Sequence, residues 1–441
     1  MPRASVGLAL FLLLTALPAS LYANPKAQFS ATSSVQVFDY PRADLGTAPV
    51  RRFAQDLRLY AFDLLDDDAL PLSLSMWTRT DVDFALLSMS APYPLAEQAQ
   101  RYSLRRVVLQ ARQWWGKLDF TVGRQVLIDE LGFFEFDGVQ LGLSLWRGLA
   151  VELLCGTELP ALGIDQHTHA ISMDAGHYLD QPLFVLGTAL RWDARDWQVR
   201  TAYRHFLRDN ASTTESRSLS LLAFARLAQP LSVSTELVLD AFLWHAQLLR
   251  LDLRLALLDT LSLAIDAERR VPHFRSSSIF GLFDLRPIDE LGLSLRYQPH
   301  PRLELGSSLA VLLYETSRPE DELEPDTLLS ASASWRFLDR FRLGVWYRGR
   351  VSADAASHST ALRFDAFDLI DRVQLSVDAY YAHLNKEWRP QASGHSFGAA
   401  LRARLELGPS VRIDSQLETL SHPLSAAELR WLGVLELGFW L

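Results

Sequence analysis

Residues 248–268 alternate leucine with charged and small polar residues over two consecutive runs. A helix turns by about 100° per residue and would scatter the charges around its whole surface, whereas a strand places successive side chains on opposite faces. One face of such a strand carries the leucines. The other face carries Arg250, Asp252 and Arg254 and, after a short turn, Asp266. The segment therefore predicts a β-hairpin with one apolar face and one ionic face.

The same alternation recurs along most of the chain, in segments of about 9–12 residues, which is the span of a tilted transmembrane β-strand. Examples are LPLSLSMW, RLELGSSLAVLL, RFRLGVWYRGRV, ALRARLEL and SVRIDSQLE. The polar faces of these segments supply the other residues that we expect to line an interior: Arg342, Arg348, Arg350, Arg402, Arg404, Glu406, Arg412 and Asp414.

The connections between the segments alternate in length. Short turns such as DARD, QPHPR and LGPSV alternate with longer polar connections such as RDNASTTESRS and NKEWRPQASGH. No linker rich in glycine, serine or proline divides the chain. This organisation predicts an all-β fold, an up-and-down antiparallel transmembrane barrel of about 18–22 strands, with short periplasmic turns and longer extracellular loops. We expect residues 24–441 to form this single domain.

Alternation alone would also fit a soluble β-sandwich. The apolar face here is rich in leucine, whereas soluble strands favour valine, isoleucine and threonine. Aromatic residues gather near the ends of the predicted strands, as in the aromatic girdles of membrane barrels. A lipid-facing arginine or lysine near the midplane costs about 2–4 kcal/mol, so the ionic face must point inward to water. The sheet must also close, because lipid offers no partner to the backbone groups of an open edge.

The first residues have the composition of an export signal. Arg3 provides a positive start, residues 6–17 are apolar, and Ala23 stands at a plausible cleavage point. We therefore expect residues 1–23 to be a cleaved signal peptide and the mature chain to reach the outer membrane of a Gram-negative cell. The net charge of −9 argues against a nucleic-acid partner. Cys155 is the only cysteine, so the chain forms no internal disulfide.

Two interpretations of the charged lining remain open. In the first, Arg342, Arg348 and Arg350, together with Arg402 and Arg404, form a basic arc that attracts carboxylated or phosphorylated solutes. In the second, which we favour, these arginines pair with facing acids and stiffen the wall. With 18 or more strands, the interior exceeds what side chains can fill, so it holds a channel or a plug. We expect a channel narrowed by loops that fold inward, with residues 156–178 as one candidate.

One short segment resembles a known family. Residues 120–146 contain Gly123-Arg124-Gln125 at the end of one predicted strand and Phe136-Asp137-Gly138 at the start of the next. This pair of motifs is similar to a segment of alginate-export-type outer-membrane proteins and related porins. The resemblance implies a monomeric barrel that passes an anionic polysaccharide or small solutes. It covers less than a tenth of the chain.

Arg124 has the strand parity of Phe120 and Val122, which places it on the predicted lipid face. It could form an ion pair with Asp137 across the hairpin, or its guanidinium could reach the lipid phosphates at the membrane surface. Both possibilities stay open at this stage.

The function that we expect is an outer-membrane porin or export channel that passes small polar or anionic solutes. Its expected partners are outer-membrane lipid, lipopolysaccharide and the barrel-assembly machinery. The alternatives are a structural or assembly barrel with a closed lumen, and a barrel-borne hydrolase that would use His358–Ser359 or His395–Ser396. These pairs are adjacent in sequence, which does not position a histidine to activate a serine. We expect no cofactor and no metal.

Overall fold

The computed structural model describes residues 26–42, 46–64, 71–84, 100–159, 183–208, 213–271, 287–315, 325–352, 355–370, 372–386, 393–422 and 425–440. These residues form one sheet of 22 strands, in which every neighbouring pair is antiparallel. The predicted signal peptide lies outside the described residues. Among the described residues, no helix has the length and apolar character needed to cross a membrane.

The strands follow one another around the sheet in chain order. The first eleven are β1 (Lys26–Arg42), β2 (Gly46–Phe62), β3 (Leu72–Asp83), β4 (Gln100–Trp114), β5 (Leu118–Asp129), β6 (Gly132–Trp146), β7 (Leu149–Leu159), β8 (Phe184–Asp193), β9 (Trp197–Arg208), β10 (Thr213–Ala228) and β11 (Leu231–Asp240). The others are β12 (His245–Leu258), β13 (Leu261–Arg270), β14 (Ile288–His300), β15 (Leu303–Tyr314), β16 (Pro325–Phe337), β17 (Phe341–Val351), β18 (Ala355–Ile370), β19 (Val373–Lys386), β20 (Gly394–Gly408), β21 (Val411–His422) and β22 (Ser425–Trp440).

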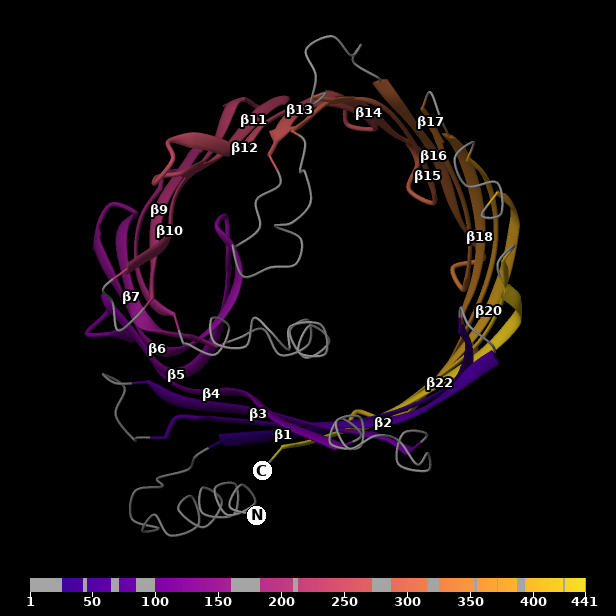
Figure 1. Cartoon of the computed structure of the whole chain (residues 1–441), viewed down its shortest axis with the longest axis horizontal. Coiled ribbons are helices and arrows are strands. Elements are labelled where there is room, and N and C mark those ends of the chain that lie inside the picture. Colours follow the sequence, from indigo (N-terminus) through magenta and orange to yellow (C-terminus); the bar gives the residue numbers. More distant parts are fainter. Residues whose placement is uncertain are drawn as a thin grey trace.

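The sheet closes on itself, because β1 pairs with β22 from Gln28–Trp440 to Phe38–Arg430. Figure 1 shows the result as a ring in which the indigo first strand lies beside the yellow last strand. The predicted antiparallel barrel is therefore confirmed, with a strand count at the upper limit of the expected range.

The connections differ between the two ends of the barrel. Nine connections at one end, here called the turn end, have only two or three residues. Every connection of ten or more residues lies at the opposite end, here called the loop end. The short turns predicted at one end are therefore confirmed, whereas the loop end combines the long connections with four of only two or three residues.

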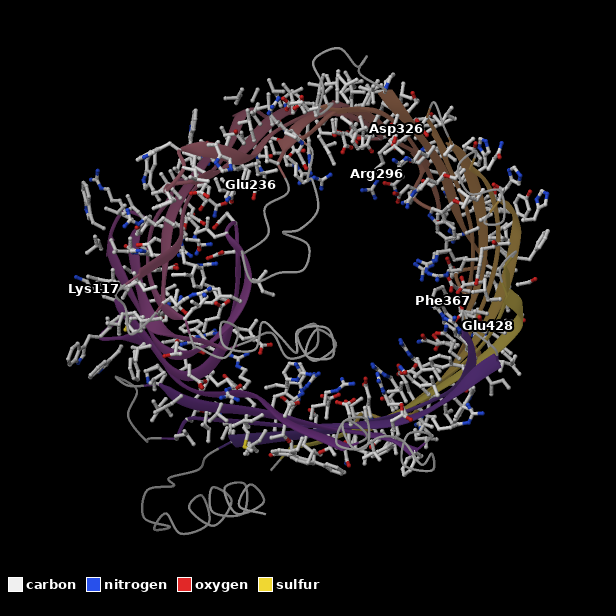
Figure 2. The ribbon with its side chains drawn as sticks, in the orientation of Figure 1. Lys117, Glu236, Arg296, Asp326, Phe367 and Glu428 are labelled. Carbon is white, nitrogen blue, oxygen red and sulfur yellow. The ribbon has the colours of Figure 1, made fainter. Side chains whose placement is uncertain are left out.

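The two faces of the sheet differ as the alternation predicts. On β12, Leu249, Leu251 and Leu257 lie on the outer face and each exposes about half of its side chain. The charged residues between them belong to the inner face. Figure 2 shows Arg296 and Phe367 projecting to the inner side of the ring. A barrel with this distribution has an apolar exterior and an ionic interior.

Candidate functional site: the lumen and its inward hairpin

The inner face of β12 and β13 carries the charges that the alternation in residues 248–268 predicts. Arg250 lies opposite Glu268, and Asp252 lies opposite Asp266. The Arg250 guanidinium is 3.2 Å from the Asp252 carboxylate and 3.8 Å from that of Glu268. Asp252 also accepts a hydrogen bond of 3.3 Å from the Ser234 hydroxyl. The inner face of these two strands thus carries arginines and carboxylates in close pairs.

Asp266 and Arg254 complete this part of the lining. The Asp266 carboxylate lies over Gly292 of β14, where an added Cβ would come within 2.3 Å of it. Gly292 thus leaves the space that this carboxylate occupies. Arg254 lies opposite Ser232 on one side and Ala264 on the other, neither of which is charged.

The inner face of β16–β21 carries the other predicted residues, and most of them pair with acids. Arg342 donates to Asp365 at 2.7 Å, and Arg350 pairs with Asp326, its Nε at 2.8 Å. The remaining pairs are Arg402–Asp378 at 3.4 Å, Arg404–Asp414 at 2.6 Å, Arg412–Asp414 at 3.0 Å and Arg412–Glu436 at 2.6 Å. Glu406 lies opposite Arg412 in the β20–β21 register. Nearly every arginine that was predicted to line this wall therefore has an acidic partner.

Arg348 is the exception on this wall. Its side chain is exposed, and within the described part of the chain we find no acid partner for it. On the turn-end side of Arg348, the inner wall has a hollow of about 380 Å³. Its lining includes Arg363, Asp365, Phe367, Arg402 and Arg404. The arginines that line this hollow come from two strands, β18 and β20.

The hairpin β5–β6 leaves the ring and lies against its inner side (Figure 1). Its tip reaches β9, although two strands, β7 and β8, separate β6 from β9 along the sheet. Arg204 of β9 pairs with Asp129 at 2.5 Å, and Arg200 pairs with Glu130 at 3.1 Å and with Glu152 at 3.2 Å. Because the hairpin occupies space inside the ring, it narrows the lumen at the level of Arg200 and Arg204, near the middle of β9.

An apolar cluster lies between this hairpin and the wall. Phe134 and Phe136 of β6 pack with Val185 of β8 and Phe206 of β9, and all four are at most 4% exposed. Leu127, Leu154 and Leu183 pack around them. The Arg204 guanidinium lies 4.0 Å from the centre of the Phe134 ring. Packing therefore encloses the Arg204–Asp129 pair, whose side chains are each 4% exposed, and attaches the hairpin to the wall.

Three glycines mark the line at which the sheet bends. Gly123, Gly138 and Gly156 lie side by side on β5, β6 and β7. Gly123 has a φ of +119°, and an added Cβ would lie 2.1 Å from the Val107 carbonyl oxygen. A Cβ on Gly138 would lie 2.2 Å from the Cys155 carbonyl oxygen. Only glycine permits this backbone conformation and this close approach.

The family-like motif lies on the bend. In the β5–β6 register Gly123 is opposite Gly138, Arg124 is opposite Asp137, and Gln125 is opposite Phe136. Arg124 makes a bidentate ion pair with Asp137, with distances of 2.9 and 2.8 Å. Gln125 donates to the Gly138 carbonyl at 3.2 Å. Of the two interpretations of Arg124, the structure shows the ion pair across the hairpin.

The position of Arg124 also explains its unexpected parity. Strand β4 pairs with β5 only up to Val107–Arg124, although β4 continues to Gln100 and β5 to Asp129. Beyond this point the hairpin turns inward and leaves β4. Arg124 donates at 2.9 Å to the Leu104 carbonyl, which lies in the part of β4 that β5 no longer covers. Where β5 leaves β4, its alternate side chains no longer face lipid and lumen in turn.

The sequence predicted residues 156–178 as one candidate constriction, and residues 160–178 of that loop lie outside the described residues. The hairpin tip, with Asp129 and Glu130, was not singled out. One signal was present: Phe133, Phe134 and Phe136 put aromatic side chains at both parities, which is typical of a strand covered on both faces.

The residues considered for hydrolysis do not form a catalytic pair. His358 and Ser359 are consecutive in β18, as are His395 and Ser396 in β20, so in each pair the two side chains point to opposite faces. His358 and His395 instead contact tyrosine hydroxyls at 2.8 Å. Among the described residues, no group of three histidine, cysteine, aspartate or glutamate side chains is placed to hold a metal ion.

No protein-family model and no curated protein sequence matches this chain. Solved structures resemble it over nearly its whole length at low identity. OccAB4 of Acinetobacter baumannii is 11% identical, with coverage of 95% of this chain and 98% of that chain and a TM-score of 0.44. The outer-membrane protein opdK of Pseudomonas aeruginosa is 9% identical, with coverage of 95% and 99% and a TM-score of 0.44. The translocation pore of the P pilus usher PapC is 9% identical, with coverage of 94% and 99% and a TM-score of 0.49. At these values the likeness says nothing about what this chain transports.

Proposed function

We propose that this chain is an outer-membrane porin, a water-filled channel for small polar or anionic solutes. The observation that carries the proposal is the closed ring of 22 strands with an ionic inner face. Side chains fill a barrel of about eight strands, whereas a ring of this size leaves open space. Charged side chains on the inner wall keep that space hydrated, because their burial in an apolar medium without partners is costly.

The β5–β6 hairpin sets the width of the proposed channel. Buried ion pairs and aromatic packing attach it to β8 and β9, so it forms a permanent constriction. On the opposite wall, the exposed Arg348 has no acid partner among the described residues, so its positive charge favours anionic solutes over cationic ones. Passage of an anionic polysaccharide, as in the alginate-export-type family, is the finer form of this proposal and remains a prediction.

The proposed location gives the two ends of the barrel their orientation. The turn end faces the periplasm and the loop end faces the outside, after export through a cleaved signal at residues 1–23. Lipid and lipopolysaccharide surround the leucine-rich exterior, and the barrel-assembly machinery inserts the chain. Membrane fractionation with a tagged chain tests this part: recovery in the soluble periplasmic fraction would contradict it.

Conductance of the refolded mature chain in a planar lipid bilayer tests the channel itself. We expect discrete, ohmic conductance steps and an anion-to-cation permeability ratio above one in a salt gradient. A folded barrel, shown by its altered migration on a gel without boiling, that gives no current at any potential would instead support the closed-lumen structural barrel. An ordinary current with cation selectivity would leave the channel standing and contradict the solute class.

A further inference from the structure

Three histidines lie side by side on the outer face of the barrel near its loop end. His358 of β18 is opposite His383 of β19, and His383 is opposite His395 of β20. We call these three residues the histidine row. They share the outer face with Leu362 and Leu401, which are nearly half exposed. The function proposed above, transport through the lumen, makes no use of residues on this face.

Two tyrosines orient the imidazoles of the histidine row. The Tyr347 hydroxyl is 2.8 Å from Nδ1 of His358, and the Tyr381 hydroxyl is 2.8 Å from Nδ1 of His395. When a phenol donates to Nδ1, the neutral imidazole carries its proton on Nε2. The rings of His383 and His395 also lie only 4.6 Å apart, centre to centre. With the tyrosines as donors, Nε2 of His358 and Nε2 of His395 each carry an N–H, on a different ring atom from the one that faces the tyrosine.

An apolar groove begins next to the histidine row and runs toward the turn end. Its volume is about 500 Å³, and Tyr381, Phe397 and Leu362 form its sides. Its floor is low because Ala379, Ala399 and Thr419 lie side by side on β19, β20 and β21. The small side chains leave a depression in a surface that otherwise consists of leucine, valine and aromatic residues. The groove therefore lies within the apolar exterior of the barrel, and the histidine row lies at the loop-end edge of that exterior.

We propose that this surface binds one phosphorylated lipid, with an acyl chain in the groove and a phosphate monoester on the histidine row. A phosphate monoester carries about 1.5–2 negative charges at neutral pH and three strong acceptor oxygens. Clustered N–H donors at the depth of the lipid headgroups are complementary to it. An acyl chain is apolar, as the groove is. The tyrosines beside the histidine row are amphipathic, which is typical of residues at the boundary between the hydrocarbon and the headgroups.

A second copy of the chain is a poorer occupant. A symmetric dimer places the same patch of each protomer against itself. Imidazole donors would then face imidazole donors, and the groove of one copy would face the groove of the other. A lipid supplies both the acceptor oxygens and the matching apolar volume, so charge and shape favour the lipid.

The inference rests on the membrane embedding of the proposed function but not on conduction. The test uses the full refolded mature chain in detergent, with bisphosphorylated lipid A and enzymatically dephosphorylated lipid A as probes. Native mass spectrometry counts the lipid molecules that the barrel retains. We expect the wild-type chain to retain one molecule of the phosphorylated probe preferentially.

The triple variant H358A/H383A/H395A removes the donors. We expect it to bind the phosphorylated probe roughly tenfold more weakly, as the loss of several hydrogen bonds implies, and to bind the dephosphorylated probe as before. The control S357A/S359A/S396A changes neighbouring residues of the same strands that point into the lumen, and it should retain the lipid. The groove variant A379L/A399L fills the depression and should weaken the binding of both probes.

Equal retention of the phosphorylated probe by the wild-type chain and the histidine variant would overturn the proposal. So would a dimer in the wild-type chain that A379L/A399L converts to a monomer without change in lipid retention. Bilayer conductance separates this test from that of the proposed function. The histidine variant should conduct as the wild-type chain does, whatever the outcome for lipid binding.

Discussion

The hairpin sector, β5–β9, and the open wall, β11–β21, both carry arginine–carboxylate pairs on the inner face, but the pairs differ in their surroundings. The Arg204 and Asp129 side chains of the hairpin sector are each only 4% exposed. Those of Arg296 and Glu304, on the open wall, are 65% and 44% exposed. The difference arises from what covers them: phenylalanines and leucines enclose the first pair, and the lumen surrounds the second. The same sequence pattern thus produces a rigid fastening in one sector and a hydrated lining in the other.

The largest effect should come from breaking a pair in the hairpin sector. Arg204→Ala leaves the Asp129 carboxylate buried without its partner, which costs about 3–5 kcal/mol. We expect the hairpin to separate from β9 and the single-channel conductance to rise. The matched variant Arg296→Ala should change the free energy of unfolding by less than about 1 kcal/mol.

Urea titration in lipid vesicles measures the free energy of unfolding of Arg204→Ala and Arg296→Ala, and bilayer recordings measure their conductance. Similar destabilisation by both would show that burial does not distinguish the two sectors. A destabilised Arg204→Ala with unchanged conductance would show that the hairpin is not the constriction.

A smaller effect should follow from the bend that defines the hairpin sector. Gly138→Ala brings a Cβ against the Cys155 carbonyl oxygen, so backbone must shift at a cost of about 1–3 kcal/mol. We expect a lower midpoint of urea unfolding and noisier single-channel currents, because the hairpin no longer rests fully on the wall.

Gly438→Ala provides the control for this bend. It adds the same methyl group on β22, where no atom lies within 4 Å of the new Cβ. If Gly438→Ala lowered the free energy of unfolding as much as Gly138→Ala, the loss would reflect the replacement of any strand glycine and not the bend.

The smallest effect should come from the open wall. Arg404→Gln removes one charge beside Asp414 in the hydrated lining, and we expect the stability to change by less than about 1 kcal/mol. The loss of a cation next to the hollow should lower the anion-to-cation permeability ratio modestly. Reversal potentials in a salt gradient measure it; a ratio that rises would contradict the assigned role of this wall.

The sequence was sufficient to predict the barrel because two simple constraints repeat along it. Most strands alternate apolar with polar residues, as β12 does with leucine, and each turn of two or three residues forces the next strand to return antiparallel. Closure then follows from the requirement that every backbone group in lipid be paired. These constraints are local, and 22 repetitions of them determine the ring.

The inward hairpin could not be predicted in the same way, because it depends on contacts between distant segments. Asp129 meets Arg204, and Phe134 meets Phe206, across more than seventy residues of sequence. The motif around Gly123 and Asp137 did indicate that this segment is special. Its resemblance to a family pointed to transport, whereas its contacts show a structural role, the bend itself.

The pairing of β1 with β22 has a consequence for how the barrel is made. Gln28 must find Trp440, so the closing seam joins residues from the two extremes of the chain. Such a contact has the longest possible loop-closure distance, and contacts of this kind form slowly. Until β22 has paired with β1, the sheet has two free edges, each able to pair with another chain. The completed seam is therefore the step at which a polypeptide at risk of aggregation becomes a barrel with no edge left to extend.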